Sequence, residues 1–233
     1  MKTVLRGRLA AVASLVRDGA YLADIGTDHA YLPIYLVQTG RIKGAVASDI
    51  RSGPLARAQK NILAAGLAEQ IHTVLTDGLS GLDRYPLTDI VIAGMGGMEI
   101  AAILEAAPFV KRACPRLILQ PMQHIPELRD YLSGGWNTEK ETQAIEGGKL
   151  YQILCVTYDG ISRPITETER LLGRYNIEHK KESPALFRIL CERHLAVLDE
   201  KIAGLEKGGL GAAKPKELRR DVAAQLEDLP PQT

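Results

Sequence analysis

An apolar run passes directly into a glycine turn in residues 21–30, which read Tyr-Leu-Ala-Asp-Ile-Gly-Thr-Asp-His-Ala. The run has the length of a strand, and the apolar residues after it predict a helix over 31–39. In a doubly wound sheet, this first strand-to-helix turn lies at the carboxyl ends of the strands, where ligands bind. Gly26 allows a close approach to the backbone, so we expect the turn to border a binding site.

The alternation of strand and helix continues along the chain. Further strands are expected at residues 44–48, 71–75, 89–93 and 116–119. Further helices are expected at residues 53–65, 98–106 and 125–132. Strands that alternate with helices of this length form a mostly parallel sheet that is covered on both faces.

Two strand-like runs then follow each other with only a short turn between them. Residues 136–145 and 150–158 are separated by Glu-Gly-Gly-Lys at 146–149, which predicts an antiparallel hairpin at the sheet edge. Parallel strands closed by an antiparallel hairpin are typical of class I methyltransferases, by analogy at the level of the fold. The predicted fold class is therefore α/β, with a Rossmann-like sheet in a first domain over 1–160.

Residues 161–233 carry a different pattern and are expected to form a second domain. Apolar residues repeat at helical spacing over 184–207 and again over 214–229, with a glycine-rich break at 208–211. This pattern predicts an α-helical hairpin of the coiled-coil-like kind. With 13 basic and 12 acidic residues, the hairpin has charged faces and serves either as a structural cap or as an arm that grips a substrate.

The composition is that of an ordinary globular chain, with 233 residues, 45% of them hydrophobic, and a formal net charge of +1. No uncharged apolar stretch reaches the roughly 18 residues that a membrane span needs, and the N-terminus lacks the apolar segment of a secretory signal. We therefore expect a cytoplasmic protein with no membrane partner. The three cysteines lack Cys-x-x-Cys spacing, so neither disulfides nor a metal site is expected. Nothing calls for a second copy, so a monomer is expected.

Acidic residues recur at the ends of the first three predicted strands. Asp24 lies in the first, Asp49 follows the second, and Asp77-Gly78 follows the third. The first turn lacks the G-x-G-x-x-G pattern, and a carboxylate there repels the phosphates of NAD. S-adenosyl-L-methionine carries a sulfonium and an ammonium group and no phosphate, so it suits an acidic turn.

Two of these acids have more specific expected roles. Asp49 can accept hydrogen bonds from both ribose hydroxyls, and Asp77 can accept one from the adenine amine. The alternatives are a charge near a helix N-terminus for Asp49 and an ordinary turn for Asp77-Gly78. Together, acids at three strand ends predict a cofactor site.

The next two strand ends are chemically different. Residues 93–97 read Ala-Gly-Met-Gly-Gly, and these glycines let a flat group lie against the backbone, with a flexible turn as the alternative. Residues 119–122 read Leu-Gln-Pro-Met, where Gln120 offers a donor and an acceptor to a base edge.

Taken together, the motifs resemble those of the bacterial tRNA (adenine-22-N1)-methyltransferases. The resemblance rests on Asp-Ile-Gly-Thr-Asp-His-Ala-Tyr-Leu-Pro at 24–33, Ile-Ala-Gly-Met-Gly-Gly at 92–97 and Leu-Gln-Pro-Met at 119–122, followed by the helical hairpin. It covers nearly the whole chain. It implies a Rossmann-like domain that binds S-adenosyl-L-methionine, a C-terminal extension that helps to hold tRNA, and methyl transfer to N1 of adenine 22.

The resemblance also implies roles for individual residues. It implies that the cofactor site contains Asp24, Gly26, Asp49, Asp77 and Gly94. Their neighbours complete the predicted cofactor site, namely Thr27, Ile50, Gly78, Leu79, Ala93 and Met95. The resemblance places Asp28 at the catalytic centre.

Charge flow suggests how Asp28 acts. Methylation at N1 leaves adenine positively charged, so we predict that Asp28 accepts a hydrogen bond from the 6-amino group and stabilises that charge. The alternative is that Asp28 caps the helix over 31–39. His29 either assists proton transfer or merely packs. Tyr31 is the candidate for stacking on an extruded base, with core packing as its alternative.

Basic residues are concentrated near the N-terminus, where the first 60 residues hold nine basic and four acidic side chains. This excess predicts contacts with an RNA backbone, and solvated helix faces are the alternative. The predicted backbone contacts are Lys2, Arg6, Arg8, Arg17, Arg57 and Lys60. The predicted substrate site is completed by Gly96, Gly97 and Gln120.

Three other functions are compatible with parts of the pattern. An NAD-dependent oxidoreductase is disfavoured by the missing glycines and by the edge hairpin. A methyltransferase acting on a different RNA, a small molecule or a protein shares the cofactor motifs. A non-catalytic RNA-binding module would need neither Asp24 nor Asp28.

Overall fold

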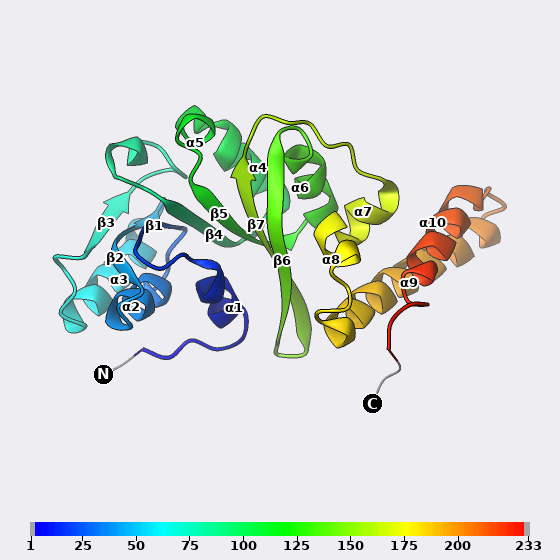
Figure 1. The fold of residues 1–233 in the computed structure, drawn as a ribbon, viewed down its shortest axis with the longest axis horizontal. Coiled ribbons are helices and arrows are strands. Elements are labelled where there is room, and N and C mark those ends of the chain that lie inside the picture. The colour runs from blue at the N-terminus through cyan, green and yellow to red at the C-terminus, as the bar shows by residue number, and fades with distance from the viewer. Residues whose placement is uncertain (1–2, 231–233) are drawn as a thin grey trace. The chain divides into compact units, whose positions relative to one another are not determined.

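A computed structural model describes residues 3–230 of the chain (Figure 1). Its contacts separate two compact units, and the boundary between them falls between Arg163 and Pro164. The first unit contains a seven-stranded sheet, and the described part of the second unit is helical. None of the described helices is both long enough and apolar enough to cross a membrane.

The sheet combines parallel strands with one antiparallel hairpin. Its strands are β1 (Ala20–Ile25), β2 (Ile42–Asp49), β3 (Ile71–Leu75), β4 (Asp89–Gly96), β5 (Arg116–Gln123), β6 (Trp136–Glu146) and β7 (Lys149–Tyr158). Their spatial order is β3-β2-β1-β4-β5-β7-β6. Neighbours among β1 to β5 pair in parallel, whereas β7 pairs antiparallel with both β5 and β6. The predicted sheet and its edge hairpin are therefore confirmed.

Glycine backbone geometry closes the hairpin between β6 and β7. Glu146 pairs with Lys149, so Gly147 and Gly148 form a two-residue turn. Their φ angles are 56° and 72°, in the left-handed region that glycine adopts at little cost. Such a turn matches the twist of the flanking strands.

Helices cover both faces of the sheet in the first unit. They are α1 (Gly7–Leu15), α2 (Tyr31–Gln38), α3 (Ser52–Ala64), α4 (Gly97–Glu105), α5 (Pro108–Ala113) and α6 (Ile125–Leu132), with a 3₁₀ turn η1 (Leu82–Arg84). α1 to α3 share one hydrophobic core with the sheet, and α4 to α6 share the other. Alternate residues of one strand serve the two cores, as Ala45 and Ala47 face the first and Val46 the second.

Two of these helices were not among those expected from the sequence. No helix is predicted from the sequence over residues 7–15, yet α1 buries Val12, Ala13 and Leu15 against the first core. The short α5 begins with Pro108, which is favourable at a helix start, and buries Val110. Both helices are short, so their apolar periodicity is weak.

The second unit contains the predicted helical hairpin. Its helices are α7 (Glu167–Leu172), α8 (Arg174–Glu178), α9 (Pro184–Lys207) and α10 (Ala213–Ala224). Lys216 pairs with Glu206 and Arg219 with Asp199, which shows that α10 runs antiparallel to α9.

The second hairpin helix ends earlier than expected. The prediction of a helix to residue 229 is wrong, because α10 ends at Ala224 and the chain continues in tight turns. Gln225 and Leu226 donate backbone hydrogen bonds three residues back, as in a 3₁₀ turn. Leu229 precedes Pro230, and a residue before proline disfavours the helical conformation.

Candidate functional site

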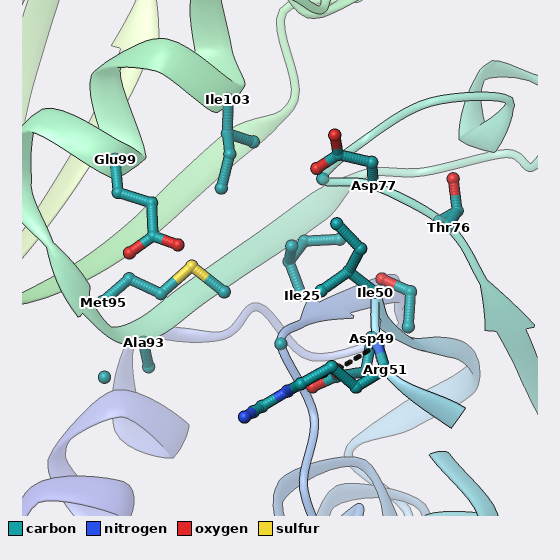
Figure 2. A pocket seen from close by; sticks show the side chains of 14 residues that line it. Ile25, Asp49, Ile50, Arg51, Thr76, Asp77, Ala93, Met95, Glu99 and Ile103 are labelled. Carbon is teal, nitrogen blue, oxygen red and sulfur yellow. Dashed lines mark hydrogen bonds and ion pairs between the residues drawn. The ribbon is translucent and has the colours of Figure 1, made fainter. Parts of the chain in front are cut away.

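A cavity of about 370 Å³ lies at the carboxyl ends of β1 to β4 (Figure 2). The neighbours of β1 are β2 on one side and β4 on the other, so the strand order reverses here. Ligands of doubly wound sheets bind at this kind of switch point, and the volume is within the usual range for small-molecule sites. The cavity is lined by Ile25, Gly26, Ser48, Asp49, Ile50, Arg51, Thr76, Asp77, Gly78, Ala93, Gly94, Met95, Glu99 and Ile103.

Eight of the eleven predicted cofactor residues line this cavity. They are Gly26, Asp49, Ile50, Asp77, Gly78, Ala93, Gly94 and Met95. The other three are Asp24, Thr27 and Leu79, which do not line it and are all buried. Leu79 is 2% exposed, and its side chain packs in the core that α4 to α6 share with the sheet.

The turn after β1 is held by Thr27. Its backbone N–H donates to the Ser48 carbonyl at 2.8 Å, and its hydroxyl accepts from the Ala30 N–H at 3.2 Å. Ala30 is the N-cap residue of α2 and has a left-handed φ of 55°. Asp28 contacts the side chains of Arg57 and His29 rather than the first turn of this helix, which argues against the alternative that it caps α2.

Asp24 is a buried carboxyl group in β1, with 8% of the residue exposed. Burial raises the pKa of Asp24 to about 6, and a hydrogen bond with Thr27 opposes part of that rise. A buried carboxylate of this kind is costly unless a cationic group compensates it.

Asp49 and Asp77 reach the cavity from neighbouring strand ends, and Figure 2 shows both side chains. Asp49 is 4% exposed, and its Oδ1 accepts the Arg51 N–H at 2.7 Å. The Arg51 guanidinium also pairs with that oxygen, at 3.5 Å. Both of these contacts use Oδ1, so Oδ2 can accept hydrogen bonds from a ligand. Asp77 also begins a turn, because its carbonyl accepts the Ser80 N–H at 3.1 Å.

Several lining residues were missed by sequence reasoning. Ser48 Oγ is buried and has no hydrogen-bond partner among the described residues, so a polar ligand group can satisfy it. Glu99 and Ile103 lie one turn apart on α4 and face the cavity (Figure 2). The sequence signal for these two residues was their spacing of four positions in the helix that follows a glycine-rich strand end, which places both on one helix face. A buried serine within a strand gives no such signal.

The glycines at the end of β4 serve different purposes. Gly94 has a φ of 83°, lines the cavity and is exposed. Gly96 lies near the Gln123 side chain, and a β-carbon on Gly96 would lie 3.6 Å from Gln123 Nε2. Gly97 is buried, and a β-carbon on it would lie 2.2 Å from the His124 carbonyl oxygen. Close backbone packing, rather than an exposed surface for a substrate, explains Gly97 in this structure.

Asp28 and His29 lie beside the cavity rather than in its lining. Asp28 is exposed, and its Oδ1 accepts from Arg57 Nε at 3.0 Å, while Oδ2 lies 3.3 Å from His29 Nε2. The hydrogen bond from Arg57 holds the pKa of Asp28 below its ordinary value, with smaller contributions from His29 and Arg51. Asp28 is therefore a carboxylate at neutral pH.

Tyr31 stacks on the His29 ring, with ring centroids 5.0 Å apart and planes at 9°. Tyr31 is 46% exposed, so the alternative that it packs in the core is wrong. The pair forms a flat aromatic surface next to Asp28.

The predicted backbone contacts are not equivalent. Lys2 lies outside the described residues. Arg6 is exposed at the start of α1, and Lys60 is exposed on α3. Arg17 bonds to Asp89, the first residue of β4, and therefore lies at the end of the strands opposite to the cavity. The structure gives Arg17 a role other than the predicted RNA backbone contact, because Asp89 is 0% exposed and needs this cation.

Gln120 is likewise placed differently from expectation. Gln120 is 0% exposed, and its Oε1 accepts from Arg8 Nη1 at 2.8 Å. Its Nε2 donates to the Pro121 carbonyl at 2.9 Å. The amide thus serves protein groups in this structure. Within the described part of the chain, no group of three or more His, Cys, Asp or Glu side chains could hold a metal ion.

The strand order, the antiparallel hairpin and the acidic cavity at the switch point define a class I methyltransferase domain. The sequence model of the family described as "Methyltransferase domain" matches residues 5–154. The tRNA (adenine(22)-N(1))-methyltransferase of Bacillus subtilis (strain 168) is 39% identical over 172 residues, which cover 68% of this chain and 70% of that protein. The chain belongs to this family of tRNA (adenine-22-N1)-methyltransferases.

Solved structures agree with this assignment. Streptococcus pneumoniae Sp1610 in complex with S-adenosyl-L-methionine is 33% identical, with a TM-score of 0.82, and the match covers 94% of this chain and 98% of that one. M. capricolum TrmK in complex with the cofactor product S-adenosyl-homocysteine is 28% identical, with a TM-score of 0.73 and coverage of 95% and 96%.

Proposed function

We propose that this chain transfers a methyl group from S-adenosyl-L-methionine to N1 of adenine 22 in tRNA. The observation that carries the proposal is the 39% identity to the Bacillus subtilis enzyme across two thirds of this chain. The acidic cavity at the strand ends supports it, because its chemistry suits a cofactor that is cationic and lacks phosphate.

The residues of the cavity fit the cofactor. Asp49 offers a carboxylate to the ribose hydroxyls, and Asp77 offers one to the adenine amine. Asp24 is a buried negative charge behind the turn and favours a cationic ligand. The unsatisfied Ser48 hydroxyl is a further polar contact. When bound, S-adenosyl-L-methionine supplies an electrophilic methyl group on a sulfonium.

Asp28 acts on the acceptor base. Each oxygen of a carboxylate can accept two hydrogen bonds, so Asp28 can bind the adenine 6-amino group while Arg57 and His29 hold it. That bond orients N1, and the negative charge stabilises the positive charge that develops on the ring. Arg57 lowers the pKa of Asp28, so this side chain stays ionised at neutral pH and keeps its role.

The stacked rings of His29 and Tyr31 offer a surface for the extruded base. Exposed cations of the first domain, over 1–160, contact the RNA backbone, with Arg6 and Lys60 as candidates. The helical domain over 161–233 helps to hold the tRNA. We expect the enzyme to act as a monomer in the cytoplasm, where its substrate is found; light scattering of the purified protein tests the first expectation.

The test is transfer of label from S-adenosyl-L-methionine to unmodified bacterial tRNA, followed by digestion to nucleosides and chromatography. The proposal predicts label in 1-methyladenosine. Label in another nucleoside would indicate a different RNA reaction. Cofactor binding without label in any tRNA would contradict the proposal and favour a small-molecule or protein acceptor.

A further inference from the structure

Helix α1 carries Arg8, and strands β5 and β7 hold its guanidinium beside the cavity, although Arg8 does not line the cavity. Arg8 lies on α1, and its Nη1 donates to Gln120 Oε1 on β5 at 2.8 Å. The guanidinium lies over the Tyr151 ring on β7, 5.8 Å from its centroid. A β-carbon built on Gly94, at the end of β4, would lie 3.8 Å from Nη1. A cation is thus fixed next to the open backbone at the end of β4.

Gln120 is built to hold this cation. The residue is fully buried, and the amide oxygen accepts from Arg8 while the amide nitrogen donates to the Pro121 carbonyl. The donation to Pro121 fixes which end of the amide faces Arg8. A base edge would have to displace both bonds in order to reach Gln120.

We propose that Gln120 is a positioning residue and that Arg8, which it orients, binds a phosphate next to the acceptor nucleotide. This inference rests on the proposed function. It separates Arg8 from the other N-terminal cations, because only a fixed guanidinium can set how deeply the acceptor nucleotide enters the site.

The surroundings of Arg8 favour an anionic ligand. The nearest carboxylate is that of Glu146, with 3.7 Å between Arg8 Nε and Glu146 Oε2, which is longer than a hydrogen bond. The Glu146 side chain is 46% exposed and adjoins the Gly147-Gly148 turn, so the pair is weak and replaceable. Guanidinium has five donors in a planar fork that matches phosphate, and 23% of the Arg8 side chain is exposed.

Arg17 shows what a purely structural arginine looks like in the same segment. Its guanidinium bonds to Asp89, whose side chain is 0% exposed, and it lies away from the cavity. Such a pair requires no ligand. A variant of Arg17 is therefore the matched control: it should destabilise the fold and leave RNA binding unchanged.

The test compares R8Q, Q120L, their double variant and R17Q in the full-length protein. For each, KM and Kd for tRNA, Kd for S-adenosyl-L-methionine, kcat and the salt dependence of tRNA binding are measured. R8Q should weaken tRNA binding by roughly 10-fold or more and reduce the salt slope by about one, with cofactor binding unchanged. Q120L should weaken tRNA binding in the same direction and add little in the R8Q background. R17Q should lower only the melting temperature.

The Glu146→Gln variant tests the same role of Arg8 without changing Gln120, and it serves if Q120L does not fold. Removing the competing carboxylate should tighten tRNA binding. The proposal is overturned if R8Q and E146Q leave tRNA affinity and salt slope unchanged, because Arg8 is then only a tie between α1 and the sheet. In that outcome the wild-type protein still methylates tRNA, whereas failure of the proposed function itself would appear as a wild-type protein without label in tRNA.

Discussion

Arg57 donates from Nε to Asp28 Oδ1 at 3.0 Å, so helix α3 holds the carboxylate that we place next to the acceptor base. One turn further along α3, Asn61 Nδ2 donates to the His29 carbonyl at 3.0 Å. Two side chains spaced by four residues on α3 thus hold Asp28 and His29 in the loop after β1. The loop that carries Asp28 is therefore tied to α3 at two points.

Replacing Asp28 by asparagine should lower kcat by roughly 100-fold, because the neutral amide cannot stabilise positive charge on the methylated ring. The affinity for S-adenosyl-L-methionine should be unchanged, since Asp28 does not line the cavity. Single-turnover methyl transfer and calorimetric cofactor titration measure the two quantities. Asp18→Asn is the matched control, an exposed acid that pairs with Arg41. Near-normal turnover in the Asp28 variant would remove its catalytic role.

Replacing Asp49 by asparagine should weaken cofactor binding by roughly 10- to 100-fold, because a charged acceptor for the ribose hydroxyls is lost. The asparagine oxygen can still accept the Arg51 N–H, so the local turn should persist. Calorimetric titration with S-adenosyl-L-methionine gives the change in Kd. An unchanged Kd would show that Asp49 serves only its turn, which is its alternative role near the start of α3.

The stability of the protein without cofactor should depend on pH through Asp24. Burial raises the pKa of Asp24 from its ordinary 3.8 to about 6, so the folded state binds this proton more tightly than the unfolded chain does. The contribution of Asp24 to the free energy of unfolding therefore falls as pH rises from about 4 to about 6 and stays low above that.

The Asp24→Asn variant tests this dependence. It should be more stable than the wild type by on the order of 3 kcal/mol at pH 7.5, and by roughly half as much at pH 5. Urea unfolding at the two pH values measures the difference. The same variant should bind S-adenosyl-L-methionine less tightly. A gain in stability that does not change with pH would contradict a buried, titrating Asp24.

Replacing Gly97 by alanine should destabilise the fold strongly, because the new β-carbon would meet the His124 carbonyl oxygen at 2.2 Å. Gly53→Ala is the matched control, since Gly53 also lies in the first turn of a helix and its nearest neighbour is 4.0 Å away. We expect G53A to be neutral or to stabilise by up to about 1 kcal/mol. Equal melting temperatures for the two variants would contradict the close packing at Gly97.

Much of the fold follows from local sequence. Successive residues of a strand face the two cores in turn, and the turn at 146–149 needs only its two glycines. The cofactor half of the site follows too, since Asp49 and Asp77 are brought to one cavity simply because they follow strands of one parallel sheet. Helix α1 was missed because a segment of nine residues shows little apolar periodicity.

The acceptor half of the site depends on tertiary pairing that spacing does not encode. Arg8 and Gln120 are 112 positions apart, and the sequence placed both as independent RNA contacts. Asp28 and Arg57 were likewise expected to act separately, and they form an ion pair. Gly97 was read as part of a substrate surface, whereas its neighbour is the backbone of the loop after β5.

The most direct test of the central claim is primer extension on unmodified tRNA after incubation with the protein and S-adenosyl-L-methionine. A methyl group on N1 blocks the pairing edge of adenine, so the account predicts a stop at position 22. The stop should disappear when adenine 22 is replaced by guanine or when the cofactor is left out. A stop at another position, or none while the cofactor binds, would contradict methylation of adenine 22.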